Sequence, residues 1–266
     1  MQRRPTADIR LRTPPKVRTR NVTWEQFKRA IAPTLESNGA WFFRGQRDSK
    51  WRLQTSLHRT TIVRNIPELK RYFEVVVPKV HDALEAWTGK AWNYSHPLGL
   101  AELLAFLQHN GFPTPLLDWS LSPYVAAYFA YEGINHFAPQ SDRVSIYSFH
   151  ATAWQGCFRQ ATDVGDPTPH VSILTPRMVG NHKLALQQGC FTWSNLPDVE
   201  THIRLNEARE QRFLTKYNLP TSERPRVMAE LKLMGITAVN LMPSVESVCK
   251  KALEDLIGLA PIEKGT

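Results

Sequence analysis

The sequence predicts an α+β fold, in which one domain holds a small, mixed or split β-sheet packed by several helices. Short strand-like runs alternate irregularly with helical runs, which differs from the regular alternation of a parallel α/β sheet. Apolar residues make up 42% of the chain and charged residues 21%, as is ordinary for a globular protein. No internal repeat or linker follows residue 20. We therefore expect a basic, flexible arm over residues 1–20, an α+β domain over 21–258 and a C-terminal tail over 259–266.

The N-terminal third should hold a helix, a strand and a longer helix. Thr23 and Gln26 have the spacing of a capping box, so a helix should begin after Thr23. An aromatic run that ends in an Arg-Gly pair follows the Asn-Gly turn and is typical of a strand. The expected elements are a helix at 23–36, a strand at 40–43, an extended or looping segment at 51–59 and a helix at 67–87 that is interrupted near residue 78.

The segment 103–131 should form two apolar helices around a short loop. Gly111 is placed to close the first helix in a left-handed conformation. Ser122 and Pro123 have the N-cap and first-turn pattern that opens the second. We expect the loop between the helices to hold His109, Thr114, Asp118 and Trp119.

The C-terminal half alternates between shorter elements. Clean two-residue periodicity predicts a strand at 143–149. A brief apolar run follows at 171–174, and further strands are expected at 189–193, 201–205 and 237–241. Residues 181–188 should form a helix or a turn, and helices are expected at 206–217, 222–234 and 244–256.

Most of the positive charge lies in the N-terminal arm. The first 20 residues contain seven Lys or Arg residues against Asp8, so they account for +6 of the net +9. Such an arm either contacts nucleic acid or an acidic partner through residues 1–20, or is a solvated extension. The sequence contains no run of 18 apolar residues, so no membrane span is predicted. No apolar segment follows the basic N-terminus, so no secretory signal is predicted either. Three widely spaced cysteines form neither a disulfide framework nor a zinc motif, which favours a cytoplasmic protein.

Arg44 is the first candidate for ligand binding. It ends an aromatic strand beside Gly45, where another backbone or a ligand can approach closely. A guanidinium in such a place needs a partner, which could be Asp118, Glu102 or a bound phosphate. Gln46 would either orient the same ligand or close a turn.

His109 and Asp118 are the candidates for acid–base chemistry. Asp118 could hold the imidazole in one tautomer. Alternatively, His109 caps a helix end and Asp118 accepts backbone N–H groups. Thr114 is a ligand contact or a fixed turn residue, and Trp119 is a stacking platform or a core residue. The histidines lack metal-ligand spacing, and no metal is predicted.

Four blocks of this sequence resemble the FRG-domain family. They are Phe43-Arg44-Gly45-Gln46 with Trp51 and Ser56-Leu57-His58-Arg59; Gln108-His109 through Asp118-Trp119-Ser120; Gln188-Gly189 with Phe191-Thr192; and Gly235-Ile236-Thr237 with Leu241-Met242-Pro243. The resemblance runs from about residue 23 to 256. Pro115 stands where a basic residue is usual. The genes that typically neighbour members of this family imply a role in bacterial stress or phage defence.

The Arg-Gly strand also resembles the first strand of ADP-ribosyltransferases. That resemblance implies an enzyme that holds NAD through Arg44, with Thr55 and Ser56 supporting the nicotinamide pocket. Gln187-Gln188 stand where those enzymes carry an acidic pair; a glutamine can hydrogen-bond a ribose but supplies no charge. The first hypothesis is therefore an NAD-binding, ADP-ribosyltransferase-like enzyme whose cleft is lined by Arg44, Ser56, His109 and Gln188. The alternative is a non-catalytic module that binds nucleic acid or protein through its basic arm.

Overall fold

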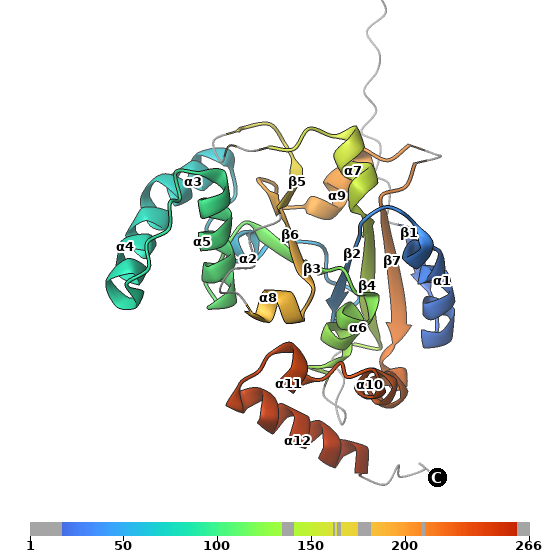
Figure 1. The fold of residues 1–266 in the computed structure, drawn as a ribbon. Helices are drawn as coiled ribbons and strands as arrows, with labels where there is room; N and C mark the ends of the chain where they lie inside the picture. Colours follow the sequence, from blue (N-terminus) through green and yellow to red (C-terminus); the bar gives the residue numbers. More distant parts are fainter. Residues whose placement is uncertain are drawn as a thin grey trace, which may run out of the picture.

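A seven-stranded mixed sheet forms the centre of the described structure. The computed structural model describes residues 18–134, 141–161, 163, 166–174, 182–208 and 211–259. Within these residues, the strand order is β1-β7-β4-β2-β3-β6-β5 (Figure 1). The strands are β1 (Arg18–Asn21), β2 (Trp41–Gln46), β3 (Leu116–Ser120), β4 (Arg143–His150), β5 (Val171–Leu174), β6 (Gly189–Ser194) and β7 (Leu214–Pro220). β1 pairs with β7 in parallel and every other pair is antiparallel. The predicted α+β class is confirmed, with one continuous sheet of larger size than expected.

Helices cover both faces and the ends of this sheet. Those of the first half are α1 (Trp24–Glu36), α2 (Ser56–Arg59), α3 (Ile66–Arg71), the π-helical η1 (Tyr72–Val76), α4 (Val77–Thr88), α5 (Pro97–His109) and α6 (Pro123–Tyr131). Those of the second half are α7 (Ala151–Cys157), α8 (His182–Leu186), α9 (Val199–Leu205), the 3-10 turn η2 (Thr221–Glu223), α10 (Arg224–Leu233), α11 (Ala238–Leu241) and α12 (Val245–Leu259). Figure 1 shows α1 beside β1 and β7, and α3 to α5 at the opposite end of the sheet.

Alternation along β2 directs side chains into two different cores. Phe43 packs with α1 and α6, in a cluster that includes Trp24 and Tyr128. Phe42 packs into a second cluster with α7 and α9, which contains Trp154. Because successive strand residues point to opposite faces, both faces of β2 are buried. A third cluster joins α3, η1, α4 and α5 to β3 and β6.

Gly45 allows α6 to lie directly against β2. A Cβ atom built on Gly45 would lie 1.9 Å from the carbonyl oxygen of Ala126 and 2.6 Å from the nitrogen of Ala130. Backbone atoms cannot move aside as a flexible side-chain end can, so a side chain here is excluded by sterics. The close approach expected beside Arg44 is therefore one between two parts of the chain.

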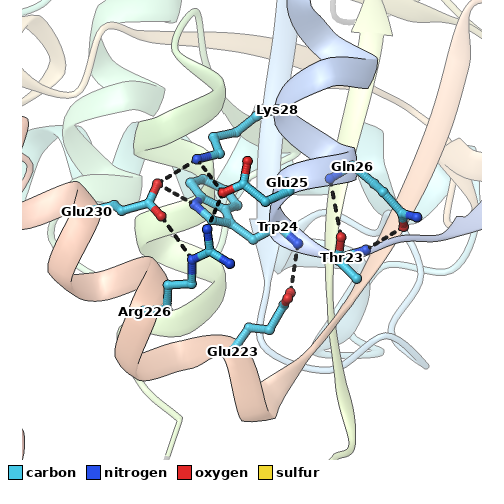
Figure 2. Close-up of polar contacts among 8 residues, drawn as sticks. All are labelled: Thr23, Trp24, Glu25, Gln26, Lys28, Glu223, Arg226 and Glu230. Atoms are coloured by element: carbon cyan, nitrogen blue, oxygen red, sulfur yellow. Dashed lines mark hydrogen bonds and ion pairs between the residues drawn. The ribbon is translucent and has the colours of Figure 1, made fainter.

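Helix α1 is tied to α10 by paired charges (Figure 2). The capping box predicted at its start is present, since Thr23 accepts from the Gln26 N–H and the Gln26 side chain accepts from the Thr23 N–H. Glu230 on α10 accepts from the Trp24 indole at 2.8 Å and from Lys28 at 2.7 Å. The burial of Trp24 is thus combined with a satisfied indole N–H.

Several predicted elements were wrong. Residues 116–120 form strand β3 and not part of a loop, because they pair with β2 on one side and β6 on the other. The strand predicted at 201–205 belongs to helix α9, and the helix predicted at 206–217 overlaps strand β7. The strand predicted at 237–241 is the short helix α11, and the extended segment 51–59 ends in helix α2. These runs are short, so partners elsewhere in the chain decided their conformation.

The N-terminal arm predicted over residues 1–20 overlaps the sheet. Arg18–Asn21 form the exposed edge strand β1, while residues 1–17 lie outside the described residues, as does the predicted tail from residue 260. No helix among the described residues is long and apolar enough to cross a membrane.

Candidate functional site

A cleft of about 880 Å³ opens beside the ends of β2, β3 and β6. Its walls come from β2, the segment 51–59, α5, α6 and the turn between α8 and β6. The polar and charged residues that line it are Arg44, Gln46, Arg47, Arg52, Gln54, Arg59, Gln108, His109, Asp118, Ser120 and Gln187. The cleft therefore joins segments of the chain that are far apart in sequence, from Phe43 to Met242, and four of its lining residues are arginines.

Arg44 lies deepest among these arginines. Its Nη1 donates to the Asp118 carbonyl oxygen at 2.5 Å and lies 3.6 Å from Asp118 Oδ2. Its Nε is buried and has no hydrogen-bond partner among the described residues. Burial lowers the pKa of this guanidinium; the Asp118 charge raises it, and the charge of Arg59 lowers it further. Arg44 thus keeps an unused donor and lies beside a second positive charge.

The other cleft arginines differ in how well their charges are matched. Arg47 lies 3.0 Å from Glu132, an acid that it shares with Lys250 at 3.3 Å. Arg52 lies 2.9 Å from Asp198. Arg59 donates to the carbonyl oxygen of Gln54 at 3.4 Å, and no carboxylate of a described residue lies within ion-pair distance of it.

Asp118 is the only carboxylate among the described residues that line the cleft. Its side chain is 58% exposed, although its neighbours on β3 are buried. Gln108 Nε2 on α5 donates to Asp118 Oδ1 at 2.5 Å. The cleft therefore combines an excess of guanidinium groups with one oriented negative charge.

Ser56 and Thr114 lie behind this carboxylate, outside the cleft lining. Thr114 is fully buried and its hydroxyl donates to Gln108 Oε1. Ser56 Oγ donates to the Thr114 carbonyl at 3.1 Å and accepts from the Thr114 N–H at 3.0 Å. Both residues therefore support Gln108, and neither faces the cleft.

The remaining candidates from the sequence fall in different places. His109, Gly45, Gln46 and Trp119 line the cleft, whereas Gln188 does not. Trp119 is 3% exposed, and its indole donates to Thr192 at 2.9 Å, so it is mainly a core residue. Gln46 Nε2 donates to the Arg52 carbonyl oxygen at 3.2 Å.

Gln187, the neighbour of Gln188, is the glutamine that faces the cleft. Gln188 has a positive φ of 48° and forms the turn into β6. Its carbonyl accepts from the Leu121 N–H at 2.9 Å, while Gln187 places its side chain near α11 through a bond to the Leu241 carbonyl at 3.3 Å.

Buried polar groups fix the wall that carries Arg52. Glu200 accepts from the Leu53 N–H at 3.2 Å and from the Tyr147 hydroxyl at 2.9 Å. Lys216 donates to the Trp51 carbonyl at 3.1 Å. Burial lowers the pKa of Lys216 and raises that of Tyr147. Side chains from α9, β4 and β7 therefore hold residues 51–53 in place.

Sequence reasoning missed Arg47, Arg52, Arg59 and Gln108 as site residues. Arg47 directly follows the Arg-Gly-Gln motif, and Arg59 and Gln108 lie inside the resemblance blocks, so their positions carried a signal. The signal was incomplete because the sequence does not show which side chains of the segment 51–59 turn toward β2.

Comparison with known proteins supports one assignment. A family model described as the FRG domain matches residues 39–138. These residues contain β2, α5, β3 and α6, and therefore most of the cleft. Residues 39–138 thus carry an FRG domain, as the first two sequence blocks indicated, whereas the blocks at 188–192 and 235–243 lie outside this match. No curated protein and no solved structure matches the chain.

Proposed function

We propose that the cleft binds NAD or a related nucleotide and that the protein acts as an ADP-ribosyltransferase-like enzyme. The observation that carries the proposal is the pair of guanidiniums at Arg44 and Arg59, which line the same cleft as a single carboxylate, that of Asp118. Arginine binds phosphate oxygens through two parallel hydrogen bonds, so such a pair suits a pyrophosphate.

The shape of the cleft supports a ligand of nucleotide size. Its volume of about 880 Å³ lies in the range of small-molecule and cofactor sites. Phe43, Phe129 and Phe191 add apolar surface to the lining. Apolar walls with a few convergent polar groups are typical of such sites, and they suit a base or nicotinamide ring.

The reaction that fits this ligand is cleavage of the bond between nicotinamide and the ribose C1′ of NAD. Nicotinamide leaves with the bonding electrons, and water or an acceptor group adds to C1′. The ribose carries positive charge at the transition state, which a nearby carboxylate stabilises. Asp118 is the cleft residue that supplies such a charge, and His109 lines the same cleft.

Titration calorimetry with NAD tests the binding step. The wild-type protein should bind NAD, and the affinity should fall as salt rises because arginine–phosphate attraction is screened. Arg59→Gln should weaken binding by about tenfold, the loss expected for one charged hydrogen-bonding group. Arg226→Gln is the matched control and should bind like the wild type, since Arg226 lies on α10, away from the cleft, and pairs with Glu25 and Glu230. A folded wild type that binds no NAD would refute the proposal.

Release of nicotinamide from labelled NAD tests the chemical step separately. Turnover that disappears in Asp118→Asn would support enzymatic cleavage. NAD binding without any nicotinamide release, with or without added protein acceptors, would reduce the proposal to a nucleotide-binding module.

The alternative of nucleic-acid binding uses another part of the molecule. Arg18 and Arg20 lie exposed on the edge strand β1, which is three strands away from β2. Binding of DNA or RNA through this edge should weaken on deletion of residues 1–17 and on Arg20→Gln, with a shallower salt dependence. Arg59→Gln should leave it unchanged, which separates this function from the cleft.

A further inference from the structure

The orientation of the Asp118 carboxylate is fixed by a directional chain of hydrogen bonds. The Leu116 N–H donates to Thr114 Oγ1 at 3.3 Å. The Thr114 hydroxyl then donates to Gln108 Oε1, which directs the amide NH₂ of Gln108 toward Asp118 Oδ1 at 2.5 Å. A main-chain donor therefore sets which end of the Gln108 amide faces the cleft.

The residues of this chain are held from behind. Thr114 exchanges two hydrogen bonds with Ser56, and its carbonyl also accepts from the Leu57 N–H at 3.0 Å. Thr114 is fully buried, so its hydroxyl cannot turn to water. Buried and mutually bonded groups of this kind keep a single geometry.

The carboxylate keeps acceptor capacity toward the cleft. Oδ1 receives Gln108, and Oδ2 lies 3.6 Å from Arg44 Nη1, which is longer than a direct hydrogen bond. A carboxylate offers about four acceptor positions and no donor. The side chain is 58% exposed, so the free positions are open to a ligand that donates hydrogen bonds.

We infer that Asp118, oriented by Gln108 and Thr114, makes the cleft select a pyrophosphate that carries ribose over a bare polyphosphate. The ribose hydroxyls would donate to Asp118 while the arginines hold the phosphates. A bare polyphosphate presents only oxygen acceptors, so its charge would be repelled by the same carboxylate. Like-charge contacts of this kind are a common device of specificity. This inference rests on the proposed nucleotide-binding function and adds the group that the cleft reads next to the phosphates.

Affinities for NAD and for inorganic pyrophosphate, measured side by side, test the inference. The wild type should prefer NAD. Asp118→Asn removes the charge with little change of shape, so NAD should bind about tenfold more weakly and pyrophosphate several-fold more tightly. Asp255→Asn is the matched control, because Asp255 lies on α12 and pairs with Lys232 and Lys251, and it should leave both affinities unchanged.

The outcomes separate the inference from the proposed function. A wild type that binds NAD, with the same preference in Asp118→Asn, refutes the inference and leaves the proposed function intact. A wild type that binds pyrophosphate and not NAD refutes the proposed function and the selection of ribose together. Binding of neither ligand has the same consequence.

Variants of Thr114 test the positioning role. Thr114→Ser retains the hydroxyl and should keep the preference for NAD. Thr114→Val has nearly the same volume without the hydroxyl, so the preference should fall by about threefold. A structural defect alone would lower both affinities together, whereas lost orientation of Asp118 changes their ratio. An unchanged ratio in folded Thr114→Val would contradict the positioning role.

Discussion

Charged residues gather in two regions of this molecule, between α1 and α10 and around the cleft, and they are paired differently. Between the helices, Lys28 lies 2.9 Å from Glu25 and 2.7 Å from Glu230. Arg226 pairs with the same two acids. In the cleft, Arg44 Nη1 lies 3.6 Å from the Asp118 carboxylate, and Arg59 has no carboxylate partner among the described residues.

The charges between α1 and α10 hold two helices together, whereas the unmatched charges of the cleft are available to another molecule. Two acids and two cations form a closed network in Figure 2, and Glu230 also receives the Trp24 indole. An arginine whose Nε is buried without a partner costs stability unless something supplies an acceptor. A bound phosphate would supply it, which is why the cleft and not the helix interface is the candidate site.

The largest expected effect tests the packing on which the cleft rests. Gly45→Ala would force a Cβ against the Ala126 carbonyl, and we expect it to lower the free energy of unfolding by about 3 kcal/mol or more. Chemical denaturation provides the measurement. Gly156→Ala is the control. Apart from its chain neighbours and its own helix backbone, no described residue has an atom within 4 Å of the added Cβ, and an alanine in helix α7 should stabilise by about 0.5 kcal/mol. Equal stability of Gly45→Ala and wild type would contradict the close approach of α6 and β2.

A smaller effect is expected where the charges are paired. Glu230→Gln removes the acceptor shared by Trp24, Lys28 and Arg226, so the free energy of unfolding should fall by about 1 to 2 kcal/mol. NAD affinity should stay at the wild-type value, since α10 does not line the cleft. A loss of binding without loss of stability would reverse the distinction between the two regions.

Acid should reduce the contributions of the two regions to folding stability in different pH ranges. Burial lowers the pKa of His58, behind the cleft wall, from 6.5 to about 4, so the native state favours the neutral imidazole. Its contribution is complete above pH 6.5 and is lost as the pH falls toward 4. The hydrogen bond from Lys28 lowers the pKa of Glu230, whose contribution is lost only below its ordinary value of 4.5.

Denaturation at pH 7 and pH 5 measures this difference. His58→Asn should reduce the loss of stability between these two pH values by about 1 kcal/mol. Glu230→Gln lowers stability equally at both pH values, so it should leave that loss unchanged and alter the pH dependence only below about pH 4.5. A wild-type slope that His58→Asn does not alter would show that other buried histidines, such as His170 with a pKa of about 4, account for it.

The smallest effect on stability is expected where a charge is unpaired. Arg59→Gln removes a cation that lies near Arg44, so the free energy of unfolding should change by no more than about 0.5 kcal/mol. Thermal unfolding measures it, with Arg226→Gln as the paired counterpart. An Arg59→Gln protein that is destabilised more than Arg226→Gln would mean that Arg59 has a structural role.

Local signals in the sequence were sufficient for the ends of helices and for the strand that carries Arg44. The capping box at Thr23 and the Ser122-Pro123 start of α6 depend on contacts within one turn, so they could be read directly. The strand β2 was recognised because its aromatic run is bounded by a turn on one side and polar residues on the other. The resemblance blocks indicated the FRG domain for the same reason, since each is a short contiguous motif.

Tertiary structure decided which of those residues meet. Strand β3 was read as a loop because it lies between the helix end at Gly111 and the helix start at Ser122, and its pairing with β2 and β6 shows that it is a strand. That pairing places Asp118 beside Arg44, 74 residues away in the chain. The choice of Gln187 over Gln188 depends on a positive φ in the turn before β6. Residue types and local caps are properties of the sequence, whereas the cleft exists because long-range strand pairing brings separate polar segments to one edge.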